Sequence, residues 1–231
     1  MVFMSRLRAG SFVFSLITLM AFALGCSNSS SSKTTIRFVN ASPSVASINA
    51  VVDGVNLAPQ IGNLGGASAY LSVASGSRHI QIENASTSTV YIDNTSSLAG
   101  GTATTFLAAN FPPTLASLVL TDDNSAPASG SFKLRVINAS PSSGPVDVYV
   151  VPTGTGIGTT PTFSGLSSPS ASVTYASNIA GSFQVIFAHA TTQNLILTSV
   201  STTYIAGQVR TIVLVDDSSN LPTTTLLNDL N

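Results

Sequence analysis

From about residue 34 to the end, the chain consists of short apolar or alternating runs separated by Gly, Pro, Asn and Ser. The runs are rich in β-branched side chains and recur about every dozen residues, as strands of a sandwich do. No helical period of useful length follows Cys26. We therefore predict an all-β fold, with strands over residues 37–39, 48–52, 77–82, 90–92, 104–108, 118–120, 134–137, 146–151, 183–187, 195–200 and 209–215.

The amino terminus has a different pattern. Arg6 and Arg8 precede an uncharged apolar run over residues 11–24, which is shorter than the about 20 residues that cross a bilayer. This pattern indicates a signal peptide over residues 1–25. The run ends in Ala-Leu-Gly before Cys26, the one cysteine of the chain. The segment resembles a bacterial lipobox, although its Ala and Leu stand in the opposite order to the usual one.

A lipobox implies that the thiol of Cys26 receives diacylglycerol and that further acylation, such as palmitate, anchors the protein to a membrane. Residues 26–33 are polar and Ser-rich, as a flexible tether is. We therefore predict a lipid-anchored protein of the bacterial cell envelope. Ser27, in place of an aspartate, favours the outer membrane if the host is Gram-negative. The alternative is an ordinary secretory signal with an unrelated cysteine.

An internal repeat organises the rest of the chain. Residues 36–44 recur as residues 134–142 with six identical positions, and the similarity continues from 48–52 to 146–150 and from 76–82 to 181–187. Repeats of about 100 residues have the size of independent domains. We predict two tandem β-sandwiches, over residues 34–129 and 130–231, which fold separately and are joined by a short linker at 124–130.

In each repeat the first predicted strand ends in the tetrapeptide Asn-Ala-Ser-Pro. Proline cannot donate to a strand ladder and holds the preceding residue extended, while Asn and Ser side chains bond to nearby backbone groups. We predict that Asn40 and Pro43, and equally Asn138 and Pro141, form a structural turn at the end of the first strand.

This opening, followed by Val-Asp-Val-Tyr-Val at residues 146–150, resembles the domain-of-unknown-function 4397 family of bacterial secreted and surface proteins. The second repeat matches better, because in the first repeat Asn49 replaces the aspartate of this motif and Ala50-Val51 replace its valine and tyrosine. Asp53-Gly54 restores the turn after this strand. The resemblance implies an Ig-like or transthyretin-like sandwich in both repeats and no catalytic residues.

Composition narrows the possible functions. The chain is 44% hydrophobic and only 7% charged, with a net charge of -1, so it has no basic surplus for a nucleic-acid partner. One cysteine allows neither an internal disulfide nor a cysteine-based zinc site. We expect no cofactor and no metal.

Few residues are candidates for chemistry. A hydrolytic triad would need His79 or His189 as its base, but the two do not occupy equivalent repeat positions. We therefore expect no enzyme. Two pairs of adjacent carboxylates, Asp122-Asp123 and Asp216-Asp217, suit calcium only if a turn makes them converge, and otherwise are solvated loop charges.

We predict a non-catalytic structural or protein-interaction module whose exposed strand edges pair with a partner in the envelope. The alternative is a glycan- or other ligand-binding surface lipoprotein. Without tryptophan, stacking on sugar rings would depend on Tyr149, Tyr175 and Tyr204, which are more typical of packing positions. A hydrolase is the third possibility.

Overall fold

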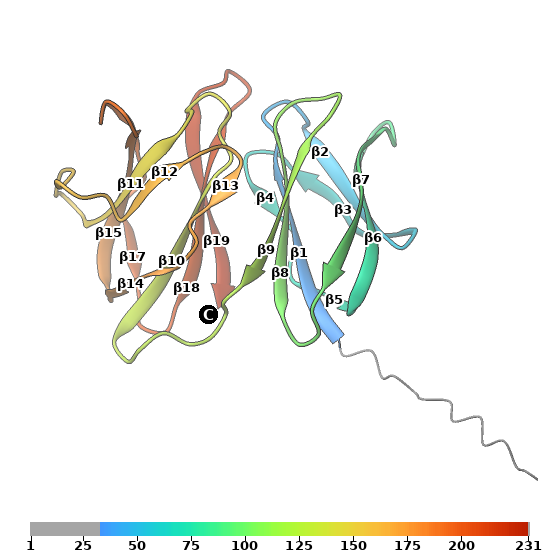
Figure 1. Ribbon diagram of the computed structural model, residues 1–231, viewed down its shortest axis with the longest axis horizontal. Helices are drawn as coiled ribbons and strands as arrows, with labels where there is room; N and C mark the ends of the chain where they lie inside the picture. The colour runs from blue at the N-terminus through green and yellow to red at the C-terminus, as the bar shows by residue number, and fades with distance from the viewer. Residues whose placement is uncertain (1–32, 231) are drawn as a thin grey trace, which may run out of the picture. The chain divides into compact units, whose positions relative to one another are not determined.

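The computed structural model describes residues 33–230, and the predicted signal peptide, Cys26 and most of the tether lie outside them. Every regular element in this range is a β-strand, and the strands form four sheets (Figure 1). The prediction of an all-β sandwich fold is confirmed. No helix in the described range is long and apolar enough to span a membrane.

The first half of the chain builds two sheets. We call them the first inner sheet and the first outer sheet, because the inner one faces the second half. The first inner sheet contains β1 (Lys33–Ala41), β4 (Gly66–Ala67), β5 (Leu71–Ala74), β8 (Ala103–Ala109) and β9 (Ala116–Asp122). The first outer sheet contains β2 (Ser47–Val52), β3 (Val55–Gly62), β6 (Gly76–Asn84) and β7 (Val90–Leu98).

The second half has the same arrangement. Its inner sheet contains β10 (Ser131–Asn138), β13 (Ser170–Ala171), β14 (Ala176–Ile179), β18 (Val209–Asp216) and β19 (Pro222–Leu230). Its outer sheet contains β11 (Val146–Pro152), β12 (Phe163–Leu166), β15 (Gly181–His189), β16 (Leu195–Thr198) and β17 (Thr202–Tyr204).

Both inner sheets are built on a parallel pair of strands. β1 pairs with β8 in parallel from Thr35↔Ala103 onwards, and β10 pairs with β18 from Lys133↔Val209 onwards. Parallel strands are usually covered on both faces and then carry near-continuous apolar runs. β1 and β18 follow this rule, since almost every residue of β1 and every residue of β18 is buried.

The two faces of each inner sheet belong to different cores. Ile36 and Phe38 of β1 point into the core of the first sandwich, against residues such as Ile48 and Ile82 of the outer sheet. The second sandwich has an equivalent core. The opposite faces of the two inner sheets form a third core between the halves: Val39, Ala41, Leu107, Ala109, Ile137, Ala139, Val213, Val215 and Leu227.

The two halves therefore pack on each other through this shared core. The described residues belong to one compact unit, and the linker between Asp122 and Ser131 spans two sandwiches that pack on each other. Gly65, with φ of +76°, lies so close to β19 that a Cβ on it would be 2.9 Å from Cβ of Thr225. Thr225 donates a hydrogen bond to the backbone oxygen of Leu64 in the same turn.

Candidate functional site

The Asn-Ala-Ser-Pro segments form buried turns in both halves. Nδ2 of Asn40 donates to the backbone oxygens of Val45 at 2.9 Å and Ile61 at 3.2 Å, while its Oδ1 accepts from the amide of Ser42 at 3.2 Å. The side chain thus joins the end of β1 to its following loop and to β3. Both the side chain and backbone of Asn40 are fully buried.

Asn138 has equivalent contacts in the second half. Its Nδ2 donates to the backbone oxygens of Gly144 and Leu166, both at 2.9 Å, and its Oδ1 accepts from the amide of Ser140 at 3.1 Å. Asn138 is fully buried as well, so neither asparagine presents a polar group to a ligand. Pro43 and Pro141 follow in these same loops.

A ring of six buried side chains joins the two inner sheets. In the first half, Arg37 Nε donates to Oγ1 of Thr105 at 3.1 Å, and that hydroxyl donates to Oδ2 of Asp122 at 2.7 Å. In the second half, Arg135 Nε donates to Oγ1 of Thr211 at 3.1 Å, which donates to Oδ2 of Asp229 at 2.6 Å.

Two ion pairs between the halves close this six-residue ring. Arg37 lies 2.7 Å from Oδ1 of Asp229, and Arg135 lies 2.6 Å from Oδ1 of Asp122. All four charged side chains are at least 97% buried. The ring holds two positive and two negative charges, so its net charge is zero, and each charge has an opposite partner as burial requires.

Two tyrosines cover the ring. The guanidinium of Arg37 lies 4.7 Å from the centre of the aromatic ring of Tyr70. The guanidinium of Arg135 lies 5.2 Å from the centre of the aromatic ring of Tyr175. Tyr70 also donates to Oδ2 of Asp122 at 2.7 Å. Burial raises the pKa of both tyrosines above its ordinary value, so both hydroxyls stay protonated. Burial is the largest influence on Arg135 and opposes its charge, but Asp122, Tyr175 and Asp229 together outweigh it, and the pKa of Arg135 is raised.

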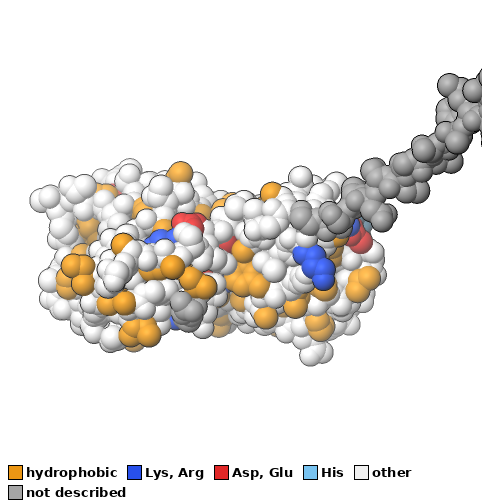
Figure 2. Space-filling model, turned by 90° about the horizontal axis from the view of Figure 1, so that it is seen from below, with side chains coloured by type: hydrophobic (Ala, Val, Ile, Leu, Met, Phe, Trp, Pro, Cys, Tyr) orange, Lys and Arg blue, Asp and Glu red, His pale blue; other side chains and the backbone are white. Residues whose placement is uncertain are grey.

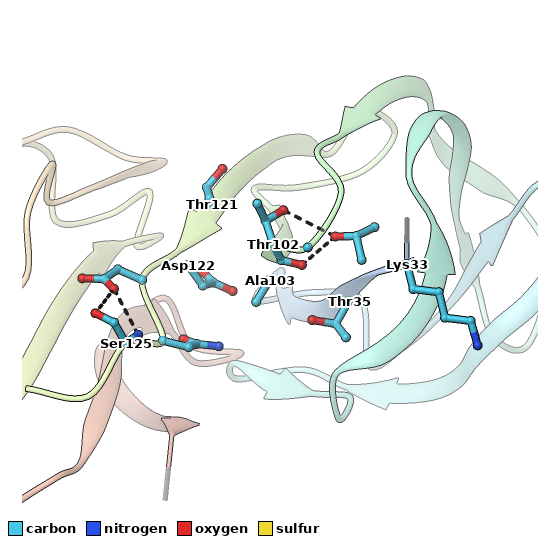
Figure 3. A pocket seen from close by; sticks show the side chains of 11 residues that line it. Lys33, Thr35, Thr102, Ala103, Thr121, Asp122 and Ser125 are labelled. Carbon is cyan, nitrogen blue, oxygen red and sulfur yellow. Dashed lines mark hydrogen bonds between the residues drawn. The ribbon is translucent and has the colours of Figure 1, made fainter. Parts of the chain in front are cut away.

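An open cavity of about 490 Å³ lies at one end of the first sandwich. Its walls are the start of β1, the turn before β8, and the end of β9 with the following residues (Figure 3). Figure 3 shows Thr35 and Thr102 near its centre, with Ser125 on one side and Lys33 on the other. Its lining residues include four threonines, Asn124, Lys33, Asp123 and Ser125.

The structure separates the carboxylates of Asp122 and Asp123. Asp122 points into the buried ring, whereas Asp123 is exposed and accepts from Lys133 Nζ at 2.6 Å and Ser125 Oγ at 2.5 Å. The hydrogen bonds from Lys133 and Ser125 lower the pKa of Asp123 to about 2. The two carboxylates do not converge as a calcium site would require.

Asp216 and Asp217 diverge in the same way. Asp216 is fully buried and accepts hydrogen bonds from the hydroxyls of Ser140 and Ser142, while Asp217 accepts from backbone amides of its own turn. Within residues 33–230 no three His, Cys, Asp or Glu side chains are grouped so that they would hold a metal ion.

The two histidines lie in different sandwiches. His79 Nε2 is 2.5 Å from Oδ1 of Asp93 on the exposed face of the first outer sheet, and hydrogen bonds from His79 and Gln81 lower the pKa of Asp93. His189 ends β15 in the second outer sheet. The structure brings them to no common site.

The tyrosines considered for sugar stacking are packing residues. Tyr149 is 1% exposed, and Tyr204 is stacked on Phe132 with ring centres 4.4 Å apart. Tyr175 covers Arg135. None of the three is an exposed aromatic platform.

These features define a protein made of two β-sandwiches that share a buried interface. The family model of DUF4397, described as a domain of unknown function, matches residues 34–149. The chain belongs to this family. The match covers the first sandwich and continues through β10 into β11 of the second.

No curated protein matches the chain. Among solved structures, a family 26 carbohydrate-binding module from Eubacterium rectale, crystallised with maltoheptaose, has 13% identity and a TM-score of 0.25, covering 85% of this chain and 96% of that one. A likeness of this size indicates neither a shared detailed fold nor a shared ligand.

Sequence reasoning missed the ring and the cavity. The repeat of Arg37 as Arg135 was visible, and a charged residue kept inside two apolar strands is a signal for a buried ion pair. The cavity residues, such as Thr35, Thr102 and Asn124, carry no motif.

Proposed function

We propose that this protein is a non-catalytic module anchored by lipid at Cys26 to a bacterial cell envelope, where it acts as a structural or protein-interaction element. It is built from two repeats of the same domain, the second a divergent copy of the first. The polar tether from Cys26 to Lys33 has seven residue steps and so spans at most about 25 Å. The sandwiches would stand close to the membrane surface.

One observation carries the non-catalytic part of the proposal: the six-residue ring. In most enzymes buried, oppositely charged side chains with shifted pKa values surround a cleft. In this chain Arg37, Arg135, Asp122 and Asp229 are paired with one another between two packed sheets and are closed to solvent. We infer that these paired charges hold the two sandwiches together, which is a structural and not a catalytic role.

The outer surface agrees with an adhesive or structural role. Figure 2 shows few charged side chains among polar uncharged atoms and scattered apolar side chains on the face it displays. Both inner sheets end in an edge strand, β9 in the first half and β19 in the second. Edge strands carry unpaired backbone groups that add to a partner's sheet.

Replacement of Cys26 tests the anchor. In cells labelled with palmitate, the full chain should carry label and partition into detergent, whereas Cys26→Ser should lose the label and move to the aqueous phase. Ser27→Ala, which changes the neighbouring residue and keeps the thiol, is the matched control. Detergent partitioning of Cys26→Ser equal to that of the unchanged protein would contradict lipid anchoring.

Ligand binding is the second candidate function, and the cavity beside Lys33 favours it. Its volume of about 490 Å³ is within the range of small-molecule sites. Its lining residues include neither histidine nor cysteine.

A further inference from the structure

The first strands of the two sandwiches begin at the same end of the molecule. Arg37 of β1 and Arg135 of β10 each lie four positions after the start of their strand, at Lys33 and Ser131, and the six-residue ring joins both arginines. In Figure 1 both strands start on the lower side of the view. The tether that follows Cys26 leads to Lys33 and so enters the protein at this end, which we call the entry end.

The length of the tether restricts which end of the protein can face a membrane. Its seven residue steps span at most about 25 Å. β1 has nine residues and is therefore about 30 Å long. An orientation that turned the opposite end toward the bilayer would place Lys33 beyond the reach of a lipid on Cys26. The entry end meets no such limit.

Two turns of the second sandwich at the entry end have the same sequence, Ile-Ala-Gly, at residues 179–181 and 205–207. Their isoleucines extend into solvent, since Ile179 is 78% exposed and Ile205 is 59% exposed. No charged residue lies within three positions of either isoleucine. The turns thus present two large aliphatic side chains without a nearby charge in the sequence.

Strand pairing makes the two turns neighbours. Gly181 in the first turn pairs with Tyr204, which directly precedes the second turn. Both turns also contact the start of β10, because Ser131 pairs with Ile179 and its backbone oxygen accepts from the amide of Gly207 at 2.9 Å. The isoleucines therefore lie close together at the entry end.

The first repeat has alanine where the second has these isoleucines. The pairings of β1 with β5 and of β10 with β14 match Ala74 to Ile179. The pairings of β6 with β7 and of β15 with β17 match Ala99 to Ile205. The common fold accepts alanine in both turns, so the exposed isoleucines are not needed for folding.

A bilayer interface suits two adjacent, uncharged aliphatic turns. Aliphatic side chains gain free energy at the boundary between headgroups and acyl chains, and charged side chains oppose entry into the bilayer. We propose that Ile179 and Ile205 insert into the interface of the bilayer that holds the lipid on Cys26, so that the entry end faces the membrane. The inference rests on the proposed lipid anchor and names the surface that contacts its membrane.

The test uses the full acylated chain in phosphatidylcholine vesicles that contain a nitroxide-labelled lipid. Acylation occupies the thiol of Cys26, the one cysteine of the chain, so an introduced cysteine accepts an environment-sensitive fluorophore. Ser177→Cys places it on the same face of β14 as Ile179. The matched control, Ser218→Cys, places it in the turn between β18 and β19 at the opposite end, near the exposed Leu221.

The fluorophore at position 177 should lose most of its emission to the nitroxide lipid, whereas the fluorophore at position 218 should keep its emission. Ile179→Ala with Ile205→Ala introduces the residues of the first repeat and should reduce the loss at position 177. Because both isoleucines are exposed, this variant should keep its melting temperature.

Equal emission from both positions, or an unchanged loss at position 177 in the alanine variant, would overturn the proposal. A blue shift at position 177 without loss to the nitroxide lipid would indicate contact with a second copy of the chain and would overturn the membrane assignment. A second fluorophore, attached to Cys26, would show a free thiol there and would overturn the lipid anchor together with this inference.

Discussion

The guanidinium of Arg37, in the first strand of the described chain, lies 2.7 Å from Oδ1 of Asp229 in the last strand. The residues are 192 positions apart, and each belongs to a different sandwich. Together with the pair Arg135–Asp122, this contact makes each half supply the counter-charge of the other. The two halves thus complete one buried, neutral network.

Removal of one charge from the ring should strongly destabilise the protein. Arg37→Met leaves Asp229, whose side chain is fully buried, without its cation, and such a loss costs about 3–5 kcal/mol. The matched control is Arg78→Met, which breaks the exposed pair with Asp53 and should cost at most about 1 kcal/mol. Urea unfolding of both variants measures the difference.

A second substitution checks the cause. The double variant Arg37→Met with Asp229→Leu leaves no unpaired buried charge at that position. It should therefore recover much of the free energy of unfolding that Arg37→Met alone loses. Equal losses in Arg37→Met and Arg78→Met would show that the ring contributes nothing to stability.

The buried asparagine turns should act through stability alone. Asn138→Ala leaves the backbone oxygens of Gly144 and Leu166 without their donor, and we expect a loss of about 2 kcal/mol. Asn94→Ala removes an exposed contact with Ser117 and should cost much less. Thermal melting gives the comparison. An unchanged melting temperature of Asn138→Ala together with lost partner binding would make the Asn-Ala-Ser-Pro turn a recognition surface.

Tyr70 and Tyr175, which cover the six-residue ring, should lower the free energy of unfolding at alkaline pH. Burial raises the pKa of Tyr70 and Tyr175 in the folded state, so the unfolded chain releases these protons first as the pH rises. Their contribution to the free energy of unfolding is complete below about pH 10, which is the ordinary pKa of tyrosine, and is lost progressively above it. Tyr70→Phe with Tyr175→Phe should flatten the fall in unfolding free energy between about pH 9 and pH 11. The same slope in both proteins would contradict this origin.

Separation of the halves should expose their shared core. Residues 34–129 and 130–231, produced as two chains, would present Leu107 and Val213 to water along with unpaired ring charges. Full burial of each such apolar side chain contributes about 1.5–3 kcal/mol. We expect the two chains to associate one to one when mixed, as ultracentrifugation would measure. Two folded halves that stay monomeric in the mixture would argue for the independent domains expected from the repeat.

The strand pattern was readable because it depends on local side-chain alternation. Runs such as residues 146–151 correspond to β11, and Asp53 and Gly54, both with positive φ, form the two-residue turn between β2 and β3. β19 was missed because its sequence, beginning Pro-Thr-Thr-Thr, is polar at the strand start. The ring was missed because its partners are distant in sequence, and a charged side chain is normally exposed.

The cavity shows a second limit of sequence reasoning. Its lining comes from the start of β1, the turn before β8 and the end of β9 with the following residues, and none of these belongs to a motif. Strand pairing brings the three segments together, and strand register is a long-range property.

We infer that the two sandwiches unfold as one cooperative block held by the six-residue ring and the shared apolar core. Differential scanning calorimetry of the full chain measures this cooperativity. We expect a single transition whose calorimetric and van't Hoff enthalpies agree, and a lower transition temperature in Arg37→Met. Two resolved transitions, with Arg37→Met shifting neither or only the one that belongs to the first half, would contradict it.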